Sequence, residues 1–314
     1  MKRLTLMLLA ALCVTMAACE KIPVDNPSGD DQDNSVPNGQ GGITEDGAVD
    51  AFFSVGDTSR VRFSRGNLQY RASTGTWRFA EHQYDIIGAL NDNISPTYDG
   101  WIDLFGWGTS GWQSGATCCQ PFSSTTTVYD YFGGYTKNDL TGANANADWG
   151  VFNPISNGGN EPGMWRTLTD KEWIYLLKTR VTKPLNGTEN ARHCSATVHG
   201  VHGLILFPDA YVHPQGVPLP DSVNRRRQDT LQNRFSDSQW ALMEQAGCVM
   251  LPLTGTRFGT KTSHVAETAK YWSSIHDYNE HRARVVHISP KGSFLTTYNQ
   301  NYYGNPVRLA QDLR

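Results

Sequence analysis

The residues best suited to chemistry in this sequence are histidines and a cysteine near the middle of the chain. His193 and Cys194 come shortly before His199 and His202, which have H-x-x-H spacing. Imidazole nitrogens and thiolates are ligands that zinc prefers. However, His199 lies beside Gly200 at a predicted turn and His202 enters a predicted strand, where residues three apart face opposite sides. We therefore expect no metal at these residues.

Other chemical patterns are weaker still. Glu161-Pro162-Gly163 is similar to the Glu-Pro-Asn triplet of calcium-dependent lectins, but Gly163 lacks the side-chain oxygen that calcium coordination uses. No paired carboxylates, Ser/His/Asp set or phosphate-binding loop stands out in the sequence. We expect a protein that is not an enzyme, with no catalytic residues, no cofactor and no metal.

The last forty-odd residues instead favour binding. A segment rich in Tyr, Asn, His and Arg lies between Tyr271-Trp272-Ser273-Ser274 and Gly304-Asn305-Pro306-Val307-Arg308-Leu309. Binding surfaces prefer these residue types, which combine large contact area with adaptable hydrogen bonds. The alternative is an ordinary sheet, since Tyr also has high strand propensity. The residues that we expect to contact a ligand are Tyr278, Asn279, His281, Arg282, Arg284, Tyr298, Asn299, Asn301, Tyr302 and Tyr303.

Two helices and a series of strands must position this segment. Thr169 with Glu172 and Ser236 with Gln239 form capping boxes that start helices, and Gly247 ends the second helix. The strands that we expect are residues 52–55, 60–64, 68–70, 76–79, 201–207, 249–253, 270–275, 284–288, 294–298 and 306–309. Residues 88–163 show no sustained period, and we expect their tryptophans to pin long loops to the core. The order of elements predicts an α+β fold.

The start of the chain predicts export and lipidation. Lys2 and Arg3 precede an apolar stretch that is too short to span a bilayer, which needs ~20 residues. We interpret residues 1–18 as a signal peptide. The Ala17-Ala18-Cys19 ending resembles the lipobox of bacterial lipoproteins, a resemblance that implies acylation at Cys19. Residues 19–50 are rich in Pro, Gly, Asn and Asp and are expected to form a flexible acidic tether.

Composition limits the remaining possibilities. Residues 51–314 are enough for a large core, and 30 Gly and 13 Tyr favour a loop-rich sheet protein. The net charge of -3 argues against a nucleic-acid partner. The cysteines after the lipidation site are Cys118, Cys119, Cys194 and Cys248, and the sequence leaves open whether one of the first two bridges to a later one or all are free.

Three segments together resemble one family. Residues 163–173, GMWRTLTDKEW, resemble the WRLPTxxEW motif of the formylglycine-generating-enzyme-like branch of the C-type-lectin fold. Residues 271–274 resemble its YWSS strand, and residues 304–309 resemble its closing GxxVRLV strand. Residues 63–70 and 77–80 resemble Bacteroidetes surface lipoproteins of the Fibrobacter-major-paralogue type. The resemblance implies a C-type-lectin-like domain over residues 51–314, with two helices, small antiparallel sheets and a ligand-facing C-terminal surface.

The resemblance also bears on whether this protein binds a ligand or catalyses a reaction. Formylglycine-generating enzymes use two late cysteines, and here only Cys248 lies late in the chain. In the variable proteins of diversity-generating retroelements, the segment between WSS and VRL is hypermutated to residue types that include Asn, Tyr, His and Asp. The residues of the segment that fall in that set include His276, Asp277, Tyr278, Asn279, His281, Tyr298, Asn299, Asn301, Tyr302 and Tyr303. A repeat template in the DNA would decide the matter.

These observations lead to one functional expectation. We expect a lipoprotein at the outer membrane and cell surface that binds a glycan or a protein in the manner of an adhesin or receptor. Its membrane contact would be the lipid at Cys19, and it would have no nucleic-acid partner. The alternatives are a structural subunit of the envelope or a fimbria, and a metal-dependent enzyme of the formylglycine-generating-enzyme-like fold.

Overall fold

The computed structural model describes residues 41–113, 119–132, 138–225, 233–277, 281–290 and 292–313. Short strands, few helices and long loops make up this part of the chain, which confirms the α+β class and its small, mainly antiparallel sheets. No helix among the described residues is long and apolar enough to cross a membrane.

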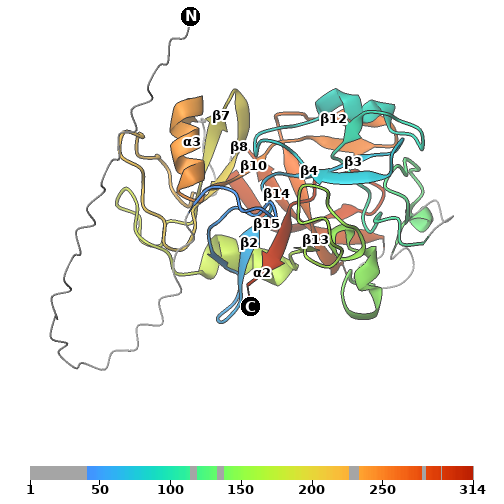
Figure 1. Ribbon diagram of the computed structural model, residues 1–314, viewed down its shortest axis with the longest axis horizontal. Coiled ribbons are helices and arrows are strands. Elements are labelled where there is room, and N and C mark those ends of the chain that lie inside the picture. The colour runs from blue at the N-terminus through green and yellow to red at the C-terminus, as the bar shows by residue number, and fades with distance from the viewer. Residues whose placement is uncertain are drawn as a thin grey trace, which may run out of the picture. The chain divides into compact units, whose positions relative to one another are not determined.

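The first sheet brings the last strand, β16, beside the first two strands, β1 and β2 (Figure 1). Its order is β1–β2–β16–β6, and its antiparallel pairs include Ala310 with Phe63 and Leu309 with Thr167. The strands are β1 (Phe53–Ser54), β2 (Arg60–Phe63), β6 (Arg166–Thr167) and β16 (Leu309–Asp312).

The last strand begins later than the sequence indicates. We expected a strand at residues 306–309, but β16 starts at Leu309. The preceding carbonyls accept single bonds from different elements, the Pro306 carbonyl from Trp272 N and the Val307 carbonyl from Leu68 N. Because these two bonds belong to different partners, they make no ladder.

A second sheet packs against one helix. Its order is β10–β8–β7–β9, and Figure 1 shows α3 beside it. Trp240 and Met243 of α3 belong to the same core cluster as the buried residues of this sheet. The elements are β7 (His193–Val198), β8 (Val201–Leu206), β9 (Arg234–Phe235), α3 (Asp237–Gln245) and β10 (Val249–Pro252). We did not predict β7, although its sequence HCSATV alternates polar and apolar residues, because two of its three apolar side chains, Cys194 and Ala196, are small and give a weak signal.

Both predicted helices start where their capping boxes indicate. Thr169 accepts from Glu172 N and Ser236 accepts from Gln239 N, and each third-position side chain bonds back to its cap. The first helix, α2 (Asp170–Ile174), continues as a π-helical segment over Tyr175–Thr179. Gly247, at φ +86°, follows the end of α3.

The third sheet carries most of the C-terminal segment. It contains β13 (Ala269–His276), β14 (Arg282–Ser289) and β15 (Gly292–Gln300) in that order. Tyr271 and Trp272 of β13 and Val285 of β14 are buried. These strands confirm the predicted positions but are longer than predicted. Lys291, between β14 and β15, lies outside the described residues.

The remaining elements are short and lie among loops. They are β3 (Leu68–Arg71), β4 (Thr76–Phe79), β5 (Trp101–Ile102), β11 (Thr256–Phe258), β12 (Lys261–Ser263), α1 (Trp149–Phe152) and the 3-10 helices Gly88–Asn93, Val128–Asp130 and Gly142–Ala147. Trp107 and Trp149 are fully buried, so these tryptophans pin the loops as predicted. Trp101 instead lies under the Arg78 guanidinium, 3.9 Å from its ring centroid.

The folded part begins earlier than residue 51. The sequence assigns residues 41–50 to the tether, yet Ala48 and Val49 are fully buried and Ala48 bridges to Ser64. The two small apolar side chains fill space beside the first sheet, where Val49 N donates to the Phe63 carbonyl. A short apolar pair inside a polar segment gives too little periodicity to reveal this packing.

Candidate functional site

Strand alternation divides the C-terminal segment into two sides. Along β14, Ala283 and Val285 are buried, while Arg282 and Arg284 are partly exposed. In β15, Asn299 is buried and pairs with Ala283, whereas Tyr298 is 47% exposed and pairs with Arg284. Side chains two apart on a strand share a side. We call Arg282, Arg284, Tyr298 and Gln300 the outer face.

One carboxylate holds both arginines of the outer face. Asp277 Oδ2 lies 3.1 Å from Arg282 Nη2, and Asp277 Oδ1 lies 3.2 Å from Arg284 Nη2. The Asp277 side chain is 5% exposed, while the arginines are 21% and 30% exposed. Two guanidinium groups share this carboxylate, so among the described residues these three side chains sum to one positive charge.

An aromatic ring completes the outer face. The Arg282 guanidinium carbon lies 3.6 Å from the centroid of the Tyr298 ring, within the range of a cation–π contact. This contact and the ion pair hold Arg282 in one position. The Tyr298 ring remains half exposed and offers a flat surface for stacking.

A cluster of three rings continues from this surface. Tyr302 stacks on Tyr303 with centroids 5.1 Å apart, and Phe258 contacts both at 5.6 and 5.4 Å. The Tyr302 hydroxyl donates to Gln300 Oε1, and Gln300 pairs with Arg282 across the strands. Phe258 is 46% exposed. This aromatic cluster (Phe258, Tyr302 and Tyr303) is therefore linked to the outer face through Gln300.

Two of the predicted contact residues face the protein interior. Asn299 is 7% exposed and its Nδ2 donates to Asn305 Oδ1, while Asn301 is fully buried and its Nδ2 donates to the Phe132 carbonyl. Our assignment of Asn299 and Asn301 to a ligand-facing surface is corrected, because strand alternation turns Asn299 inward and Asn301 secures a loop.

The other predicted residues have different positions. Tyr278 and Asn279 lie outside the described residues. His281 has φ +69°, and its carbonyl accepts from Asn301 N, so it forms the turn that leads into β14. Sequence reasoning missed the contribution of Phe258, because β11 lies before the segment and only the folded chain brings it to Tyr302 and Tyr303.

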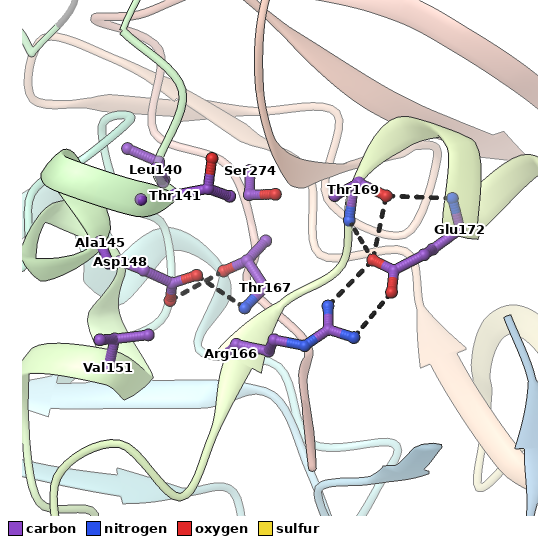
Figure 2. A pocket seen from close by; sticks show the side chains of 11 residues that line it. Leu140, Thr141, Ala145, Asp148, Val151, Arg166, Thr167, Thr169, Glu172 and Ser274 are labelled. Atoms are coloured by element: carbon purple, nitrogen blue, oxygen red, sulfur yellow. Dashed lines mark hydrogen bonds and ion pairs between the residues drawn. The ribbon is translucent and has the colours of Figure 1, made fainter. Parts of the chain in front are cut away.

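A separate pocket of about 360 Å³ lies at the start of α2 (Figure 2). Arg166 bridges Glu172 and Asp312, while Glu172 also accepts from the backbone N–H and hydroxyl of Thr169. Asp148 caps α1 by accepting from Gly150 N. These bonds hold Arg166, Thr169 and Glu172, which belong to residues 163–173, in fixed positions.

Burial changes the acidity of Asp148, one of the residues that line this pocket. Asp148 is 1% exposed, and burial raises the pKa of its carboxyl to about 6. Hydrogen bonds from Thr167 N, Gly150 N and the Thr167 hydroxyl, with the Arg166 charge, oppose this rise. The carboxyl is therefore mostly ionised at neutral pH and sits in an environment of few charges.

The histidines that opened the sequence argument do not converge. His202 Nδ1 lies 2.8 Å from Thr197 Oγ1, whereas His199 Nδ1 lies 3.0 Å from Asp237 Oδ1. Burial and the charges of Arg180 and Arg192 lower the pKa of His193 to about 3. Within the described ranges, no group of three or more His, Cys, Asp or Glu side chains is placed to hold a metal ion.

The described cysteines are all buried. Cys194 and Cys248 are free, Cys119 Sγ lies 3.3 Å from Gln113 Oε1, and Cys118 lies outside the described residues. Burial raises the pKa of the Cys248 thiol well above its usual value, and it also raises the pKa of the Cys194 thiol. Neutral, buried thiols of this kind behave as small apolar side chains.

Comparison with known proteins adds no relative. No protein-family model, no curated protein and no solved structure matches this chain.

Proposed function

We propose that the protein is a membrane-tethered ligand-binding protein, which recognises a glycan or a protein through the outer face and the aromatic cluster. The C-type-lectin-like fold and the acyl anchor at Cys19, at the outer membrane and cell surface, belong to the same proposal. They depend on the sequence resemblance alone.

The observation that carries the proposal is the half-exposed Tyr298 ring under a fixed Arg282. Arginine and tyrosine are the residues that most often dominate binding energy at interfaces. Here Asp277 and the ring restrain Arg282 before any ligand arrives. A restrained side chain loses less entropy on binding, which favours recognition over a merely structural role.

The charge of the surface narrows the kind of ligand. Among the described residues, Arg282 and Arg284 contribute two positive charges to this surface and Asp277 contributes one negative charge. The exposed Tyr298 ring and the exposed edge of Phe258 add flat apolar area. A ligand with an acidic group beside a planar or apolar face, as in an acidic sugar or a peptide, is complementary to this combination.

The test begins with the purified full-length protein on an array of glycans and proteins. Ligands found there are then measured against Tyr298→Ala and Arg284→Ala. We expect each substitution to weaken binding at least tenfold, because it removes the ring or a charged donor from the surface.

A matched control is available in α3. Leu242 is 47% exposed, the same fraction as Tyr298, and it lies on an element outside the third sheet. Leu242→Ala should bind as the unaltered protein does. Equal binding by all variants, or loss only when the protein unfolds, would contradict the proposed surface.

A further inference from the structure

The pocket at the start of α2 has polar groups that the fold itself does not use. Ser274, in β13, is 1% exposed, and among the described residues its Oγ has no hydrogen-bond partner. A buried hydroxyl without a partner costs about 1–3 kcal/mol. Figure 2 shows Ser274 between Thr141 and Thr169 in this view, at the wall of the pocket. A ligand in the pocket would satisfy it.

A second hydroxyl lies beside it without a structural role. Thr141 occupies the cap position of the 3-10 helix Gly142–Ala147, yet its side chain makes no capping hydrogen bond. Cap residues normally accept such a bond. Thr141 lines the same pocket as Ser274, so its hydroxyl is also available to a ligand.

The third available acceptor is charged. Asp148 Oδ1 accepts from Gly150 N and from the Thr167 hydroxyl, but Oδ2 accepts only from Thr167 N among the described residues. A carboxylate oxygen has two lone pairs, so Oδ2 retains one. Asp148 lies on the wall of the pocket with the two hydroxyls.

The balance of charge in the wall is negative. Asp148 and Glu172 contribute carboxylates, and Arg166 contributes the one guanidinium among the described lining residues. Arg166 is already shared between Glu172 and Asp312, with the shortest contacts at 2.7 and 2.6 Å. An anion would therefore meet a neutralised arginine and an unpaired carboxylate, whereas a cation would meet a partner.

One part of the wall is aliphatic. Leu140, Ala145 and Val151 line the pocket, and Figure 2 shows Val151 below Asp148 in this view. The volume of about 360 Å³ is at the lower end of the range for small-molecule sites. A ligand must therefore be small and must combine a polar head with a short apolar part.

We propose that this pocket binds a primary ammonium group carried on a short aliphatic chain. An ammonium has three N–H donors, which match Asp148 Oδ2, Ser274 Oγ and the Thr141 hydroxyl. The chain lies against Leu140, Ala145 and Val151. No described residue of the outer face or the aromatic cluster lines this pocket, so the inference is independent of the proposed function.

The test compares three probes of similar size with the purified full-length protein at pH 7.5. Butylamine, 1-butanol and butyrate are titrated, and dissociation constants are measured by ligand-observed NMR. We expect butylamine to bind at least tenfold more tightly than 1-butanol, and butyrate to bind more weakly than either. Equal affinity for the amine and the alcohol, or no measurable amine binding, overturns the proposal.

Three substitutions locate the binding. Ser274→Ala removes one acceptor and should weaken butylamine binding about five- to tenfold. Val151→Phe should fill the pocket and abolish binding, while Asp148→Asn removes the charge but keeps an oxygen for the helix cap. Should Asp148→Asn fail to fold, the first two variants still decide, because unchanged butylamine affinity in both overturns the proposal. Leu242→Ala, on α3, is the control, and it should retain full affinity for butylamine.

Discussion

Arg308 and Arg284 belong to the same C-terminal region but make opposite kinds of contact. Arg308 is fully buried, and it donates to two neutral oxygens, Gln83 Oε1 at 2.6 Å and the Met250 carbonyl at 3.3 Å. Arg284 is 30% exposed, and it pairs with the Asp277 carboxylate. Burial lowers the pKa of Arg308 to about 10, whereas Arg284 stands in contact with solvent.

This difference separates structural from recognition residues in a segment where sequence type does not. A buried guanidinium must have all its partners inside the protein, so its removal damages the fold. An exposed guanidinium exchanges its partners with water, so its removal costs little stability. We call residues 271–274 and 307–309 the anchor segments, and we expect them to determine stability while the outer face determines binding.

The largest expected effect is at Trp272, in the first anchor segment. Its ring is fully buried, and its Nε1 donates to the Phe105 carbonyl at 2.7 Å. Trp272→Ala should lower the free energy of unfolding by about 4 kcal/mol, since it leaves a large cavity and an unpaired carbonyl. Urea denaturation followed by tryptophan fluorescence measures the change.

Tyr298→Ala is the matched aromatic substitution on the outer face. We expect it to change the free energy of unfolding by less than about 1 kcal/mol, because the ring is half exposed. If the two substitutions destabilised the protein equally, the division between anchor segments and outer face would fail.

The arginines provide the next comparison, with the same replacement at both positions. Arg308→Met should cost about 2–3 kcal/mol, because Gln83 Oε1 and the Met250 carbonyl lose a buried donor. Arg284→Met should cost less than about 1 kcal/mol, as is usual for exposed ion pairs. Thermal and urea denaturation of the two variants under identical conditions measure the difference.

Salt gives an independent check on the same pair. The Arg284–Asp277 pair is partly exposed, so added salt should reduce any stability difference between Arg284→Met and the unaltered protein. The cost of Arg308→Met should remain, since its contacts are buried and its partners are neutral. A larger cost at Arg284 than at Arg308 would reverse the roles that we assign.

The sequence predicted the elements with strong local causes. The capping boxes at Thr169 and Ser236 and the strands around Trp272 and Val285 all lie where predicted. The uniformly buried strand β7 was missed although its residues alternate, because its apolar side chains Cys194 and Ala196 are small and give only a weak period-two signal.

The site was harder to predict than the fold class, and the reason is geometric. Arg282 and Tyr298 face outward while Asn299 faces inward, and this depends on strand register, which one residue of shift would invert. The pocket joins residues 140–151 and 166–172 with Ser274, which lies more than 100 residues later. No spacing in the sequence indicates that these side chains meet.

The smallest expected effect concerns His276, the last residue of β13. It is followed by Asp277, which pairs with Arg282 and Arg284 of the outer face. Burial lowers the pKa of His276, while Asp139 and Asp277 oppose the shift and His281 adds to it. Above about pH 6.5 the imidazole is neutral in both folded and unfolded states. As pH falls, the unfolded chain binds a proton first, so stability falls.

His276→Phe keeps a ring beside Trp107, whose centroid lies 5.4 Å away, and removes the titration. Urea denaturation between pH 7.5 and 5 should therefore show a shallower loss of stability in the variant, although His193, with the same sign, leaves a decline in both proteins. If stability fell equally with pH in the variant and the unaltered protein, His276 would titrate as an exposed residue does, which would contradict its assignment to the buried residues of β13.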